Sequence, residues 1–138
     1  MRLERTKLPL LLASLLLLAA CTQTDSDSDP TRVFAYAFSM QSPPSGVVAR
    51  NGYRLKRGTT SIWRLQLSGP AAKQFVAQRW PDLTAAIRRS FVQGSQTPWF
   101  APGRDVKYVT LVSPSDPGVM VMMTVDSDDV FIAYDASQ

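Results

Sequence analysis

A short apolar run near the N-terminus ends at the only cysteine of the chain, and it limits which residues can form a folded core. From Leu8 to Ala20 the chain is apolar apart from one proline and one serine, and Cys21 follows directly. A helix needs about 20 apolar residues to cross a bilayer, so this run of 13 is too short to span one. Three basic residues precede it: Arg2, Arg5 and Lys7. The pattern is typical of a secretory signal peptide, which is removed from the mature protein.

The end of the apolar run, Leu18-Ala19-Ala20-Cys21, resembles the lipobox of bacterial lipoproteins. The resemblance covers residues 1–21 only. It implies that residues 1–20 are the signal peptide, that the Cys21 thiol receives a diacylglyceryl group, and that the new amino group is acylated. These lipids would anchor the protein stably, whereas a single chain binds a membrane only marginally. The alternative is an ordinary signal peptide with an incidental cysteine, although a lone free thiol is a liability in an exported protein.

The residues after Cys21 indicate which membrane holds the protein and how long the segment is that joins Cys21 to the folded domain. Lipoproteins with Asp directly after the lipidated cysteine stay in the inner membrane under the sorting rule that the resemblance implies, and here that position is Thr22. We therefore expect the periplasmic face of the outer membrane, in the cell envelope. Residues 22–31 contain no hydrophobic side chain, which predicts a disordered tether over 21–31. Its three aspartates resemble a calcium loop, but the turn glycine and the closing glutamate are missing.

The remaining residues, 32–138, are long enough for a single domain with one hydrophobic core. The signal peptide removes three basic residues and one acidic residue, so the net charge falls from +4 to +2 and gives little support for nucleic-acid binding. The chain has no histidine, and its one glutamate, Glu4, lies in the signal peptide. Triads that use histidine, histidine metal sites and paired glutamates are therefore excluded. We predict no enzyme activity, no metal and no cofactor other than the lipid.

Residue periodicity predicts an α+β domain. The predicted strands span residues 33–40, 47–50, 53–57, 62–67, 106–113, 119–125 and 130–134, with Asn51-Gly52 as a hairpin turn and a second turn at residues 58–60. Residues 71–79 and 82–93 are predicted to be helical, separated by Pro81, with Leu83, Ile87 and Phe91 as a buried stripe and Gly94 as the stop. The expected architecture is an antiparallel sheet of six or seven strands, with one kinked helix or two short helices on one face.

Three groups of residues are candidates for contact with a partner. The basic stretch comprises Arg50, Arg54, Lys56, Arg57 and Arg64 and could bind an anionic envelope component or an acidic protein; alternatively it is a solvated hairpin. The loop 98–104 presents Trp99, Phe100 and Arg104 as a partner contact, unless its aromatic rings fold under to cap the core. The acidic end comprises Asp126, Asp128, Asp129 and Asp135, residues that suit turns or a weak calcium site. The basic and acidic groups could form opposed charged patches.

These observations favour a membrane-anchored envelope lipoprotein with a small, non-enzymatic periplasmic binding or assembly domain. Its expected partners are the membrane, through the lipid, and an envelope protein or anionic envelope component, with no nucleic acid. One alternative is a periplasmic inhibitor or immunity protein. The other is an aspartate-dependent enzyme acting on cell wall or lipid, which would need a pocket with two aspartates, or with an aspartate beside Lys107 or Tyr108.

Overall fold

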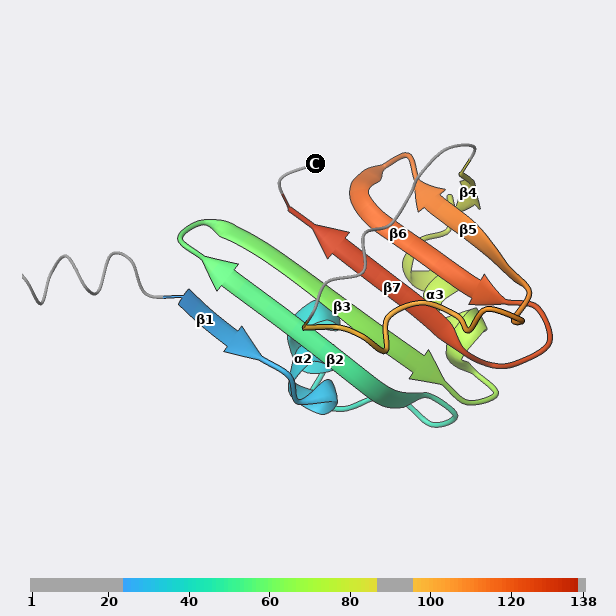
Figure 1. Cartoon of the computed structure of the whole chain (residues 1–138), viewed down its shortest axis with the longest axis horizontal. Coiled ribbons are helices and arrows are strands. Elements are labelled where there is room, and N and C mark those ends of the chain that lie inside the picture. The colour runs from blue at the N-terminus through green and yellow to red at the C-terminus, as the bar shows by residue number, and fades with distance from the viewer. Residues whose placement is uncertain (1–23, 87–95, 137–138) are drawn as a thin grey trace, which may run out of the picture.

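The computed structural model describes residues 24–86 and 96–136, which form one antiparallel sheet and two helices (Figure 1). The elements are β1 Thr24–Asp27, α2 Pro30–Phe38, β2 Val48–Arg57, β3 Thr60–Ser68, α3 Ala72–Arg79, β4 Thr84–Ala85, β5 Tyr108–Ser113, β6 Asp116–Thr124 and β7 Val130–Asp135. The seven strands lie in the order β1-β2-β3-β7-β6-β5-β4. The predicted α+β class and antiparallel sheet are confirmed. The signal peptide and Cys21 lie outside the described residues.

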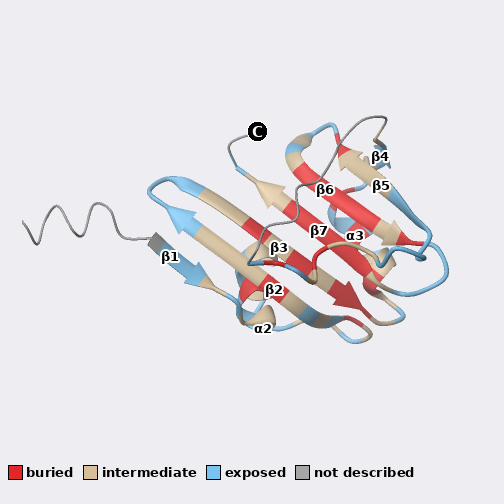
Figure 2. Ribbon diagram, in the orientation of Figure 1, coloured by how far each residue is buried: buried red, intermediate tan, exposed pale blue. Residues whose placement is uncertain are grey.

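Two hydrophobic clusters lie on opposite faces of the sheet, because successive strand residues point to opposite sides. The first cluster contains residues of the central strands and of both helices; it includes Val33, Phe34, Trp63, Leu65, Leu67, Ala72, Val76, Val121 and Ile132. The second cluster contains the alternate strand residues and one loop residue: Phe100, Met120, Met122, Phe131 and Ala133. Figure 2 shows the buried residues concentrated along β3, β7 and β6, with exposed residues at the β2–β3 turn.

The prediction of a strand over residues 33–40 is wrong, because residues 33–38 belong to α2, which ends at Phe38. Asp29 begins the helix: its side chain accepts a hydrogen bond from the Arg32 amide at 3.0 Å, and Pro30 occupies the first turn. The alternating aromatic residues fit a helix equally well. Phe34 and Phe38 are separated by four residues, so they share a helical face, and their ring centroids lie 4.9 Å apart.

The predicted tether also differs from the structure. Residues 24–27 form β1, which pairs antiparallel with β2, and Asp27 bonds the Arg32 side chain through both carboxylate oxygens, at 2.8 and 3.2 Å. This bonding lowers the pKa of Asp27. Residues 24–31 are therefore part of the folded unit, although they contain no large apolar side chain. Strand pairing and three ion pairs, Asp25–Arg54, Asp27–Arg32 and Asp29–Arg32, hold them instead of burial.

Asn51-Gly52 is not a turn but part of the continuous strand β2. The register between β2 and β3 shifts between Ala49 and Asn51, which marks a bulge, and the Asn51 side chain donates to Gln66 at 2.8 Å. A Cβ on Gly52 would lie 2.9 Å from the Cα of Pro30, so this glycine allows α2 to approach the sheet. The hairpin turn lies at residues 58–59, within the second predicted turn, and Gly58 there has φ +60°.

The C-terminal half agrees better with the sequence patterns. The predicted helix 71–79 is confirmed as α3, and the last three strands are confirmed with ends shifted by a few residues. The helix predicted over 82–93 is wrong for residues 82–86, because Thr84 and Ala85 form β4 and pair with β5. Ile87, Phe91 and Gly94 lie outside the described residues. Within the described ranges 24–86 and 96–136, no helix has the length and apolar character needed to cross a membrane.

Candidate binding groove

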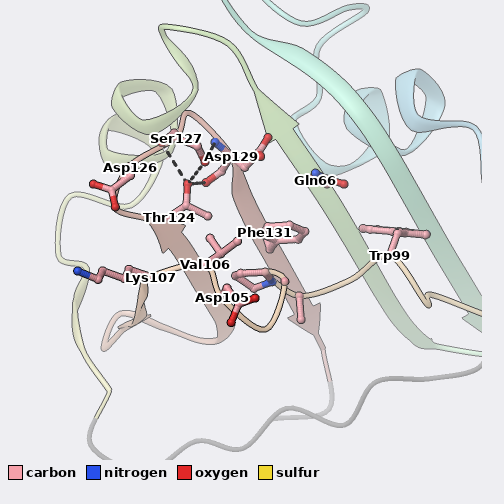
Figure 3. A pocket seen from close by; sticks show the side chains of 13 residues that line it. Gln66, Trp99, Asp105, Val106, Lys107, Thr124, Asp126, Ser127, Asp129 and Phe131 are labelled. Carbon is pink, nitrogen blue, oxygen red and sulfur yellow. Dashed lines mark hydrogen bonds between the residues drawn. The ribbon is translucent and has the colours of Figure 1, made fainter.

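A groove of about 510 Å³ lies on the second face of the sheet, between the loop that precedes β5 and the β6–β7 turn (Figure 3). Its floor is Phe131 of β7 and Gln66 of β3, which are register partners on adjacent strands. Trp99 and Val106 of the loop line it. Four charged residues also line it: Asp105, Lys107, Asp126 and Asp129. The groove thus combines aromatic surface with charge, which is the composition expected of a ligand site.

Thr124 holds the β6–β7 turn at the groove. Its side chain is 3% exposed, and its hydroxyl bonds the Asp129 carbonyl at 2.8 Å and the Ser127 hydroxyl at 2.6 Å. The Ser127 hydroxyl also accepts a hydrogen bond from the Asp129 amide at 3.3 Å. These bonds satisfy buried polar groups and give the turn a defined shape. Asp126 and Asp129 are therefore presented from a structured turn.

Phe100 anchors the loop that forms the other wall. It is fully buried and meets Phe131 edge-on, with ring centroids 5.9 Å apart. The guanidinium of Arg64 lies 5.5 Å from the centre of the Phe100 ring. Trp99 stands edge-on to Phe100 and remains half-buried at the groove. The alternative that an aromatic ring folds under the loop is thus correct for Phe100, while Arg104 is exposed outside the groove.

The charge of the groove favours a positive ligand. Three carboxylates, those of Asp105, Asp126 and Asp129, line the groove, together with one ammonium group, that of Lys107. Among the residues that the structure describes, none of these four forms an ion pair. A cationic group would meet the negative charge and could also lie against the faces of Phe131 or Trp99. The described residues contain no group of three acidic or cysteine side chains arranged to hold a metal ion.

The predicted basic stretch does not form one surface. Arg54 bonds Asp25 across the β1–β2 pair at 3.1 Å, and Arg50 bonds the Ser68 hydroxyl at 2.6 Å. Arg64 is half-buried over Phe100, and burial lowers its pKa. Lys56 and Arg57 are exposed at the end of β2, on opposite faces of the strand and next to the β2–β3 turn. The stretch divides because successive strand residues face opposite sides of the sheet: Arg54 and Lys56 lie on one face, and Arg57 and Arg64 lie on the other.

The acidic residues of the C-terminal end divide as well. Asp126 and Asp129 line the groove, Asp128 is exposed outside it, and Asp135 lies at the far end of β7. Sequence reasoning did not identify Gln66, Thr124, Phe131 or Asp105 as parts of a site. The pairing of β3 with β7 brings Gln66 beside Phe131, and that pairing left no local pattern in the sequence. Asp105 adjoins the predicted aromatic loop, so its position offered a weak indication.

Comparison with protein-family models found no matching family, and neither the curated proteins nor the solved structures gave a significant match.

Proposed function

We propose that this protein is a lipid-anchored lipoprotein of the bacterial envelope, with a non-enzymatic binding domain held on the periplasmic face of the outer membrane. The apolar run and the Leu18-Ala19-Ala20-Cys21 motif support the anchor. The groove on the sheet face opposite the helices supports the binding role. Both helices contribute to the first hydrophobic cluster, so the second face is available to the loop and the groove.

The single observation that supports a ligand class is the acidic, aromatic lining of the groove. A volume of about 510 Å³ lies within the range of small-molecule sites, roughly 300–1,000 Å³. It suits an ammonium or guanidinium group with a short polar or apolar stem. Two envelope sources present such a group: a lysine or arginine side chain of a partner protein, and a free amine of a cell-wall peptide.

Binding can be tested by NMR titration with two probes, a lysine-containing peptide and a cell-wall peptide with a free side-chain amine. Both should shift signals of Phe131 and Asp129, and N-acetylation of the amine should abolish the shifts. The double variant Asp105→Asn/Asp129→Asn should weaken binding about tenfold, equivalent to about 1.4 kcal/mol. Asp128→Asn is the matched control, because it removes the same charge outside the groove. If the double variant and the control bind alike, the groove is not the site.

Anchoring is tested separately by Cys21→Ser. The variant should leave the membrane fraction and lose acyl labelling, while the wild type retains both. A variant that stays membrane-bound would contradict lipidation at Cys21.

The groove also has the composition that an aspartate-dependent enzyme would need, because aspartates line it together with Lys107. Tyr108 is exposed and does not line it. An enzyme would require turnover of cell-wall or lipid substrates that is abolished by Asp105→Asn, Asp126→Asn or Asp129→Asn. Binding without turnover supports the binding module.

A further inference from the structure

We propose that the β2–β3 turn docks on anionic phospholipid headgroups of the bilayer that anchors the protein, with Lys56 and Arg57 contacting lipid phosphates. This inference rests on the proposed lipid anchor at Cys21. It adds an orientation to that anchor: one end of the sheet rests on the membrane, and the groove faces away from it.

The first step is the length of the segment that joins Cys21 to the first strand of the domain. β1 begins at Thr24, so only two residues separate it from Cys21. Consecutive Cα atoms are 3.8 Å apart, so the Cα atoms of Cys21 and Thr24 lie within about 11 Å of each other. A ten-residue tether would reach about 35 Å and leave the domain free to turn. The start of β1 is instead confined close to the membrane surface.

The second step is the position of β1 in the sheet. Thr24 pairs with Arg57, the last residue of β2, so the start of β1 lies beside the β2–β3 turn (Figure 1). The end of β7 reaches the same region, because Asp135 pairs with Ile62. The short connection therefore brings the turn, rather than another part of the domain, to the bilayer.

The third step is the charge at this end. Residues 56–60 are all exposed, and Lys56 and Arg57 form no ion pair within the described ranges 24–86 and 96–136. Two carboxylates lie near this end: Asp25 is bonded to Arg54, and Asp135, the register partner of Ile62, interacts electrostatically with Arg64. An apolar hollow of about 270 Å³ lies directly beside Arg57, lined by Leu55, Thr60 and Ile62. A guanidinium next to apolar surface matches a phosphate headgroup above its glycerol and acyl carbons.

The fourth step is the opposite end of the sheet. Val130 pairs with Leu67, so the β6–β7 turn lies at the end of β3 away from the β2–β3 turn. Gln66 follows Thr60 by six positions, which corresponds to about 20 Å along a strand. Three carboxylates of the groove lie at this distant end. An anionic bilayer would repel them, so both ends of the charge distribution favour the same orientation.

The test uses the full-length protein purified from membranes and reconstituted into nanodiscs that contain a lanthanide-chelating lipid. Paramagnetic broadening of amide signals falls steeply with distance from the bilayer. On anionic phospholipid, the signals of residues 57–60 should broaden most and those of residues 125–129 least. The variant Lys56→Gln/Arg57→Gln should lower the ratio of docked to undocked protein about 30-fold, since each basic residue near an anionic surface contributes about fivefold. The matched control, Lys73→Gln/Arg104→Gln, removes two charges elsewhere and should keep the gradient.

Three results would overturn the docking proposal: equal broadening at both ends, an unchanged gradient in the Lys56/Arg57 variant, or an unchanged gradient on neutral phospholipid. The mass of the purified protein reports separately whether Cys21 is acylated. If it is not, the proposed anchor fails, and coupling the Cys21 thiol to a maleimide lipid still measures docking of the turn. The two failures are therefore distinguishable.

Discussion

The side chain of Arg54 lies 3.1 Å from Asp25 and 4.3 Å from the centre of the Tyr36 ring. This contact joins three segments that the sequence patterns treat as separate: a tether, a misassigned strand and a basic hairpin. It places an acid from the segment after Cys21 directly against the basic stretch. The folded unit therefore includes residues 24–27, and Arg54 is not available to an external anion.

Replacing Gly52 with alanine should destabilise the protein by about 1–3 kcal/mol, because the new Cβ would lie 2.9 Å from Pro30 and 3.0 Å from Val33. Urea unfolding measures the change. Gly103→Ala is the control; its Cβ would meet Val106 at an ordinary 3.5 Å, so its effect should stay within about 0.5 kcal/mol. Equal effects would show that α2 does not rest on Gly52.

Removing the helix cap should weaken α2. Asp29→Ala should lower the free energy of unfolding by about 1 kcal/mol, because the Arg32 amide loses its side-chain acceptor. Asp29→Asn keeps an acceptor oxygen and should restore most of the loss. Chemical denaturation of the three proteins decides the matter; if the asparagine variant is as unstable as the alanine variant, the side-chain cap is not the cause.

Phe100→Ala should cost about 3–5 kcal/mol, since the ring is fully buried against Phe131. Trp99→Ala should cost less, because Trp99 is only half-buried. Thermal unfolding reports both losses. Similar losses for the two variants would contradict the assignment of Phe100 as the anchor of the loop.

Acid should reveal the role of Asp82, whose pKa is lowered from 3.8 to about 2 by hydrogen bonds from Ser113 and Ser115. A carboxyl group whose pKa is lowered by folding contributes its full stabilisation at pH values above its pKa in the unfolded chain. This contribution decreases as the pH falls toward 2. Asp82→Asn should therefore reduce Tm at pH 7, with a difference from wild type that shrinks between pH 4 and pH 2. A difference that does not depend on pH would show that ionisation of Asp82 is not responsible.

Local patterns in the sequence predicted the parts of the fold whose burial is periodic along the chain. In β3, Trp63, Leu65 and Leu67 share one buried face, so their alternation identified a strand. The same rule failed for residues 33–38. Phe34 and Phe38 satisfy both a period of two and a helical spacing of four, and only contact with the sheet decides between them.

The sequence by itself determined the α+β class, the positions of β3, α3 and the last three strands, and the lipobox-like pattern that motivates the anchor. The tertiary structure decided the rest, because those features depend on contacts between residues far apart in the chain. Asp25 meets Arg54, Gln66 lies beside Phe131, and the acidic turn faces the aromatic loop only after the strands pair. Burial periodicity is a local property and can be recognised in a sequence, whereas pairing across the sheet leaves no such local pattern.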